Sequence, residues 1–518
     1  MYRILKNNSL SYNKIFHIFT PSLIASLGIG VVTSLLLFVP PYKGVADNGD
    51  FFRVAYSNGL YYLPHYDSNY FGYFVRQYGL LNYYNENGST YFSSQSLFIQ
   101  LSIMLNRLFF SSHIFDIRFQ AVIYVLLLMI GIYLLVESLT CMATNVLSGY
   151  FVAGLTVFIF GDSAYTEYFN SLYSESTMYV SFIFIAAFSL LLYRNRYNNL
   201  LLVILYTVSA VIFVTLKQQN APLSLIFALF GMSFCMINKN RFFRWTVVFL
   251  MLVILGSGVM TYHFISDEFN NINQYQALTR GVLLNSKDPE QSLQSLGINK
   301  QYALLRESIY YQQYSTVGVN SNELRKGLYD HYNFVSISIY YIKNLDQFVD
   351  LLNTAAVHWF DVRPMAMGNF ERSSGYAFGA HTSFFSGYNT IRKLIAPGRF
   401  GFIVVFGLLV SGCYLFSFIQ AYRQKKKRLF IRFFLILTFL LLGTAATMMS
   451  IIGDGDADLS KHLLLFPITF DCMITMFLSD LITKHVFKNH GIVNRKQDRT
   501  RRREMQENLP STPVLEDL

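Results

Sequence analysis

The chain has 518 residues, of which 53% are hydrophobic and 17% aromatic but only 14% are charged. This composition is too apolar for a soluble protein of that length, and it predicts an all-α polytopic membrane protein. A net charge of +11 could suggest a nucleic-acid partner. The lysines and arginines, however, fall in short clusters between apolar runs and in the C-terminal tail, so we expect no nucleic-acid binding.

About ten apolar runs have the length that a helix needs to cross a bilayer. The expected spans are residues 20–40, 119–137, 143–161, 175–193, 199–216, 221–237, 245–264, 399–419, 432–452 and 463–482. The first run follows Arg3, Lys6 and Lys14 and lacks a small-residue cleavage site. We therefore expect it to stay in the protein as a signal anchor with a cytoplasmic N-terminus.

The distribution of basic residues supports one orientation for all ten spans. With a cytoplasmic N-terminus, only the inner connection after the second span lacks basic residues. The others contain Arg194, Arg196, Lys239, Arg241, Arg244, Arg423, Lys425, Lys426, Lys427 and Arg428. A basic tail from Lys484 to Arg503 follows the last span, so we expect both termini in the cytoplasm and the tail against anionic membrane lipid.

Two large connecting segments are expected on the outer side. The first connecting segment, residues 41–118, is tyrosine-rich and includes a predicted amphipathic helix near 97–110. The second connecting segment, residues 265–398, has helix-start signals at Asp288 and Ser321, and its apolar part 333–360 carries charges that favour an outer location. The expected organisation is a membrane module 1–264, a helical outer segment 265–398, membrane helices 399–482 and a tail 483–518 that ends in disorder.

Ionisable and polar residues recur where predicted spans reach the outer side. We expect the following to bind substrate: Arg53, Asp162, Glu167, Tyr173, Glu175, Lys217, Gln218, Asp456, Asp458, Lys461 and His462. Ionisable groups at span ends are costly to desolvate and are often functional when they face a cavity. The alternative is that these short outer loops are simply solvated and acidic.

Asp47 and Asp50 come directly after the first span, where the chain leaves the membrane. A carboxylate at this depth can deprotonate an acceptor hydroxyl, while Lys217 or Lys461 balances the charge of a departing phosphate. A lipid-linked sugar phosphate presents its head group there. We expect Asp50 to be the general base and Asp47 the second candidate, because Asp47-Asn48-Gly49 is also a good turn signal.

The arrangement resembles the GT-C superfamily of membrane glycosyltransferases, and within it the hexose transferases of bacterial surface-glycan biosynthesis. Three stretches carry the likeness: Asp47-Asn48-Gly49-Asp50-Phe51, Asn170-Ser171-Leu172-Tyr173-Ser174-Glu175 and Ala457-Asp458-Leu459-Ser460-Lys461-His462. The resemblance implies a polyprenyl-phosphate hexose donor, a glycan or lipid-linked acceptor, and an extracytoplasmic site in the bacterial plasma membrane.

For the site itself, the resemblance implies an acidic first-loop residue as base or acceptor-binding group, which carries over to Asp50 with Asp47 as its neighbour. The superfamily often pairs adjacent acidic residues, whereas two residues separate them here. Some members bind a divalent metal, and Asp454-Gly455-Asp456 has a spacing that could contact one. That spacing alone is a weak signal, so a metal is possible but we expect none to be obligatory.

Two further classes of function stay open beside the glycosyltransferase. A polysaccharide polymerase or ligase that uses lipid-diphosphate glycans would be expected to rely on outer arginines. The second connecting segment offers Arg280, Arg306, Arg325, Arg363 and Arg372. A flippase or transporter would need ionisable groups near the middle of the membrane and preferably two similar halves, yet the charges lie at span ends and no internal repeat is visible.

Overall fold

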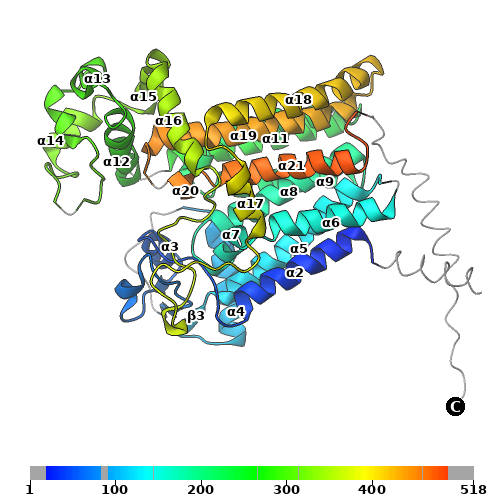
Figure 1. The fold of residues 1–518 in the computed structure, drawn as a ribbon, viewed down its shortest axis with the longest axis horizontal. Coiled ribbons are helices and arrows are strands. Elements are labelled where there is room, and N and C mark those ends of the chain that lie inside the picture. The colour runs from blue at the N-terminus through cyan, green and yellow to red at the C-terminus, as the bar shows by residue number, and fades with distance from the viewer. Residues whose placement is uncertain are drawn as a thin grey trace, which may run out of the picture.

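The computed structural model describes residues 19–82, 92–143, 145–264, 267–312, 314–457 and 459–487. Apolar helices lie side by side in a bundle, and both large connecting segments lie at one end of it (Figure 1). The bundle helices are α2 (Pro21–Phe38), α5 (Arg118–Thr140), α6 (Val146–Phe160), α8 (Glu175–Arg194), α9 (Asn199–Val214), α10 (Leu223–Met232), α11 (Arg241–His263), α18 (Phe400–Arg423), α19 (Phe430–Asp454) and α21 (Leu465–Ile482).

Each of the ten predicted apolar runs is occupied by one of these helices, and the chain is a mostly helical, multi-pass membrane protein. Within the described residues, eight helices are long and apolar enough to cross a membrane, with α10 extended from Gln218 to Met236. A ninth span results if α6 and Ser163–Asn170, which meet at 53°, count as one. Helix α9 is a shorter apolar helix.

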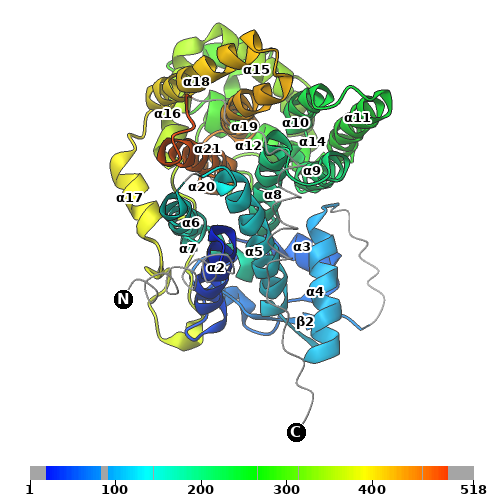
Figure 2. The ribbon, with the colours of Figure 1, turned by 90° about the vertical axis from the view of Figure 1, so that its right-hand side faces the viewer.

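Helix α8 lies at the centre of the bundle, packed against α5, α9 and α21 (Figure 2). Nearly all of its residues are buried, whereas α11 and α18 are mostly exposed at the periphery. The exposed apolar surfaces of the peripheral helices are suited to contact with lipid. The central helix α8 is surrounded by other helices, and these contacts fix the position of its first residue. That first residue is Glu175, at the end of the bundle that carries the connecting segments.

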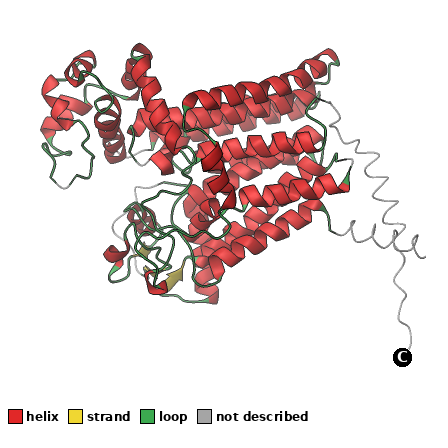
Figure 3. Ribbon diagram, in the orientation of Figure 1, coloured by secondary structure: helices red, strands yellow, loops and turns green. Residues whose placement is uncertain are grey.

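The first connecting segment contains helix α3 (Phe51–Ser57), helix α4 (Gln95–Phe109) and a small antiparallel sheet (Figure 3). Helix α4 confirms the predicted amphipathic helix. The sheet has the order β1-β2-β3, from β1 (Leu60–Tyr61), β2 (Gln77–Leu80) and β3 (Ile114–Asp116). Its strands of two to four residues are too short to show alternation, which is why the sequence did not predict them.

Most of the second connecting segment is a set of short helices beyond the bundle. They are α12 (Asp267–Gln276), the π-helix Ala277–Val282, α13 (Pro289–Ser295), the 3₁₀ helix Lys300–Leu305, α14 (Asn322–Leu324), the π-helix Arg325–Tyr329, α15 (Phe334–Lys343) and α16 (Leu345–His358). Both predicted helix starts are confirmed, because Asp288 caps α13 and Ser321 caps α14. Residues 333–360 form two short helices that are not among the candidate spans.

The rest of the second connecting segment returns to the first. The backbone N–H of Gly44 donates a hydrogen bond to the carbonyl of Asn369, and that of Ala46 donates to the carbonyl of Gly368; each N···O distance is 3.0 Å. Helix α17 (Gly387–Ile395) then runs beside α6. The stretch that leads to Asp50 is therefore held by chain that lies more than 300 residues away in sequence.

Candidate functional site

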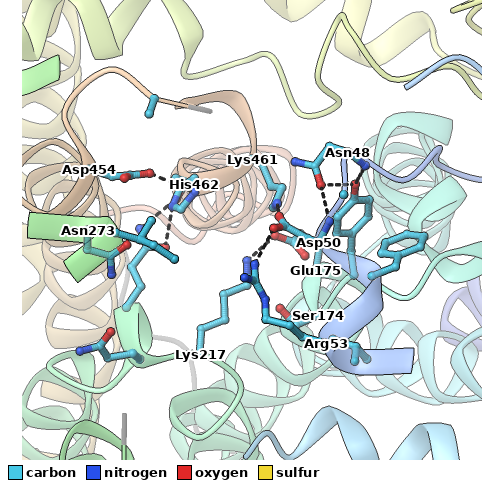
Figure 4. A pocket seen from close by; sticks show the side chains of 18 of the residues that line it. Asn48, Asp50, Arg53, Ser174, Glu175, Lys217, Asn273, Asp454, Lys461 and His462 are labelled. Atoms are coloured by element: carbon cyan, nitrogen blue, oxygen red, sulfur yellow. Dashed lines mark hydrogen bonds and ion pairs between the residues drawn. The ribbon is translucent and has the colours of Figure 1, made fainter. Parts of the chain in front are cut away.

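A cavity of about 960 Å³ lies at the end of the bundle that carries the connecting segments. The first connecting segment, the start of α8, the segment between α9 and α10, helix α12, and the segment between α19 and α21 all contribute to its wall. Figure 4 shows that the polar side chains from these distant parts of the chain point toward one another. Nine predicted site residues line the cavity: Asp50, Arg53, Tyr173, Glu175, Lys217, Gln218, Asp456, Lys461 and His462.

Asp47 does not line the cavity but shapes the turn that leads to Asp50. Its buried Oδ1 accepts hydrogen bonds from the backbone N–H groups of Gly49 (2.7 Å) and Phe51 (3.1 Å). Its Oδ2 accepts from the hydroxyls of Tyr62 (2.9 Å) and Tyr66 (3.0 Å). Burial raises the pKa of Asp47, against the opposing effect of these hydrogen bonds. Gly49 has φ +102°, a conformation that favours glycine.

Tyr173 stabilises the same turn through hydrogen bonds and a ring contact. Its hydroxyl accepts from the backbone N–H of Asn48 (2.9 Å) and lies 2.9 Å from Asn48 Oδ1, while the ring packs edge-on against Phe51. The Lys461 ammonium lies 4.9 Å from the centre of the same ring. Tyr173 therefore links the turn that carries Asp50 to the lysine that contacts it.

Asp50 lies between two cations. Its Oδ1 accepts from Arg53 Nη2 at 2.8 Å, and its Oδ2 is hydrogen-bonded to Lys461 Nζ. The Asp50 side chain is 39% exposed, whereas that of Lys461 is 7% exposed. Burial alone would raise the pKa of Asp50, but the charges of Lys461 and Arg53 hold it well below its usual range. Asp50 is therefore an ionised carboxylate that faces the cavity.

A second acid–lysine pair lies next to this group. Glu175, the first residue of α8, is 1% exposed and its Oε1 accepts a hydrogen bond from Lys217 Nζ. Its other oxygen, Oε2, is buried and accepts no hydrogen bond from the described residues. A buried carboxylate oxygen without a hydrogen-bond partner costs folding free energy. Glu175 Oε2 is therefore suited to accept a hydrogen bond from a hydroxyl of a bound ligand or from a water.

The end of α19 and the segment that follows it add two more carboxylates to the cavity wall. Asp456 accepts two hydrogen bonds from Arg280, at 2.7 and 2.8 Å. Asp454 accepts from Gln276 Nε2 at 2.6 Å and lies 3.5 Å from His462 Nε2. The two carboxylates thus face different partners, and the described residues hold no cluster of three His, Cys, Asp or Glu side chains that could bind a metal.

Two predicted site residues, Asp162 and Glu167, lie away from the cavity. Asp162 is buried, caps Ser163–Thr166 and accepts from the backbone N–H of Asn389 at 2.9 Å. Glu167 is buried and pairs with Arg363 at 3.1 Å, so both carboxylates fix the second connecting segment to the bundle. Asp458 lies outside the described residues.

Several residues that line the cavity were not predicted from the sequence. Among them, Asn48 and Gln219 adjoin predicted site residues, so their position in the same loops was an available signal. Gln276 comes from helix α12 of the distant second connecting segment, and no pattern in the sequence linked it to this site. Arg280 was predicted only as one of the outer arginines that a polysaccharide polymerase or ligase would use.

The comparison with protein families decides the identity of the chain. The family model described as the YfdI N-terminal transmembrane domain matches residues 6–503. The chain belongs to this family. The YfdI family is a GT-C-like family of membrane glycosyltransferases, in agreement with the resemblance noted above. No curated protein and no solved structure matches the chain significantly.

Proposed function

We propose that this YfdI-family protein transfers a hexose from a polyprenyl-phosphate donor to an extracytoplasmic glycan or lipid-linked acceptor. The observation that carries the proposal is the exposed carboxylate of Asp50, held by Lys461 and Arg53 in the wall of a cavity. A carboxylate can take a proton from an acceptor hydroxyl, and the neighbouring cations can stabilise a phosphate leaving group. Family membership supports the same class of reaction.

In the proposed reaction, the acceptor oxygen attacks the anomeric carbon from the side opposite the phosphate. The new carbon–oxygen bond forms as the bond between the anomeric carbon and the phosphate oxygen breaks, and the electron pair stays on the phosphate. Asp50 takes the hydroxyl proton, while Lys461, Arg53 and Lys217 balance the phosphate charge. The displacement inverts the anomeric centre.

The apolar side of the cavity supports a lipid-linked donor. Phe92, Leu216, Phe264 and Ile272 line it, and Phe264 is 62% exposed at the end of α11. A prenyl chain would bury apolar surface here while its phosphate reaches the cations, and each buried methylene contributes about 0.8 kcal/mol. A soluble nucleotide-sugar donor has no prenyl chain that could bury this apolar wall.

The proposal also covers location and metal use. The clustered basic residues lie at the opposite ends of the spans, so the positive-inside rule favours an extracytoplasmic cavity in a bacterial plasma membrane. We include no obligatory metal, because Asp454 and Asp456 already contact Gln276 and Arg280, and chelation with EDTA is expected to leave transfer unchanged. Asp458 lies outside the described residues. Loss of transfer in EDTA would indicate that a divalent metal takes part.

The polymerase or ligase alternative receives less support. Of the five arginines that it could use, only Arg280 lines the cavity, and it is engaged by Asp456. Arg363 is engaged by Glu167 instead. A transporter would require ionisable groups that line a path through the spans, whereas the ionisable residues that line this cavity lie at one end of the bundle.

The decisive experiment is transfer of a labelled hexose from its polyprenyl phosphate in reconstituted membranes. Asp50→Asn is expected to lower transfer by about 10²–10⁴-fold, the usual contribution of a general base. Asp361→Asn, which removes the carboxylate of a partly exposed ion pair outside the cavity, serves as the control and should retain most of the transfer. Full transfer by a folded Asp50→Asn variant would show that the assignment of the base is wrong.

A further inference from the structure

The contacts of Asp50 are unusual for a catalytic base. Both oxygens of the carboxylate are engaged by cations. A base in this state is stabilised as the anion and has little tendency to take a proton. The carboxylate needs a change in its surroundings before it can perform the role proposed above.

The other acids of the cavity differ from Asp50 in this respect. Glu175 pairs with Lys217, and Asp456 with Arg280, so each acid is matched by one cation. Asp50, by contrast, contacts two cations, Lys461 and Arg53. A phosphate that enters the cavity can contact the same two cations and so competes with Asp50 for them.

We infer that the donor phosphate takes over Lys461 and Arg53 and thereby releases Asp50 to act as the base. This inference rests on the proposed function and adds a coupling between the two substrates to it. Donor binding converts Asp50 from an ion-pair partner into a proton acceptor, and without donor an acceptor hydroxyl is not deprotonated. Lys461 and Arg53 are then the residues through which one substrate prepares the site for the other.

Thermodynamic linkage makes the coupling measurable. If the phosphate and Asp50 compete for the same cations, the negative charge of Asp50 must weaken phosphate binding. By reciprocity, phosphate must raise the pKa of Asp50 by the corresponding amount, one pH unit for each factor of ten in affinity. The effect can be read from binding alone, without turnover.

The test is calorimetric titration of the full-length protein, reconstituted in nanodiscs, with a short-chain prenyl phosphate that carries no sugar. Asp50→Asn is expected to tighten binding by about tenfold or more, equivalent to about 1.4 kcal/mol. Asp50 supplies no side-chain hydrogen bond to the start of α3, so the asparagine variant keeps the helix cap as it is. The uncharged prenyl alcohol should bind the parent and the variant equally.

Two controls separate competition from a general charge effect. Asp361→Asn removes the same charge from an ion pair with Lys393 outside the cavity, and it should change phosphate affinity by less than about twofold. Lys461→Met should weaken phosphate binding, and the double variant with Asp50→Asn should lack most of the tightening. Such non-additivity is the signature of two groups that act through a shared partner.

Three outcomes would overturn the inference. Phosphate affinity that is unchanged or weaker in Asp50→Asn would show that Asp50 does not compete for the cations, and if Asp50→Asn still abolished hexose transfer, the proposed function would stand. Equal tightening by Asp361→Asn would show that the effect is one of general charge. A parent protein that binds no prenyl phosphate and transfers no hexose would overturn the proposed function as well.

Discussion

Two carboxylates of this protein each pair with an arginine but have opposite surroundings. Asp471, in α21, accepts hydrogen bonds from Arg392 Nη1 (2.6 Å) and from the hydroxyls of Tyr165 (2.6 Å) and Tyr388 (2.5 Å). Its side chain is 0% exposed. Asp50 also contacts an arginine, together with a lysine, but 39% of its side chain is exposed in a cavity wall.

The difference shows how one chemical motif serves two purposes. The sealed group around Asp471 joins α17 to the bundle, and no ligand can approach it without local unfolding. The open group around Asp50 keeps the same charges within reach of a substrate. Exposure to a cavity, and not residue type, separates the structural carboxylate from the candidate base.

The largest effect on stability is expected from breaking the sealed group. Arg392→Met should lower the free energy of unfolding by about 3–5 kcal/mol, because it leaves the charge of Asp471 buried without its cation. Lys393→Met is the matched control: Lys393 is the next residue and its pair with Asp361 is partly exposed, so the cost should be about 0–1 kcal/mol. Thermal unfolding in detergent measures both, and equal losses would contradict the comparison.

An intermediate effect is expected at Asp47, which is sealed although it lies three residues from Asp50. Asp47→Asn disturbs hydrogen bonds from two tyrosine hydroxyls, at a cost of about 1–3 kcal/mol. Transfer should fall through displacement of Asp50, by less than in Asp50→Asn, and together with thermal stability. A loss of transfer as large as in Asp50→Asn, at unchanged stability, would instead make Asp47 the base.

The smallest effect concerns pH. The pKa of Asp50 is lower in the folded protein than in the unfolded chain, so its ion pairs stabilise the fold above the unfolded value of about 3.9. That stabilisation is lost only as the pH falls through the lower, folded value. The difference in melting temperature between the parent and Asp50→Asn should therefore stay constant from about pH 8 to pH 5. Narrowing within that range would contradict the ion-pair assignment.

The spans could be predicted from the sequence because an apolar run of sufficient length has few alternatives to a membrane helix. The helix starts at Asp288 and Ser321 were equally local signals, and capping hydrogen bonds confirm them. The three-stranded sheet was missed because its register joins strands of two to four residues that carry no periodic pattern.

The site could be predicted only in part, since side-chain direction within a loop depends on tertiary packing. Glu167 and Glu175 lie eight residues apart in the same predicted loop. The 3₁₀ turn Glu167–Asn170 directs Glu167 toward Arg363, whereas Glu175 begins α8 and lines the cavity. The contact between Asp50 and Lys461 joins residues 411 apart, and only their common membrane level suggested it.

The contacts of residues 454–462 limit which segments can be exchanged between members of the family to make chimeric proteins. It contacts the second connecting segment through Arg280 and Gln276, helix η3 (Gln218–Asn220) through Gln219, and the candidate base through Lys461. A chimera that replaces residues 267–358 alone would present foreign partners to Asp454 and Asp456 while keeping the native Lys461. Grafts that carry residues 454–462 with the helices they contact should preserve activity better than grafts that divide them.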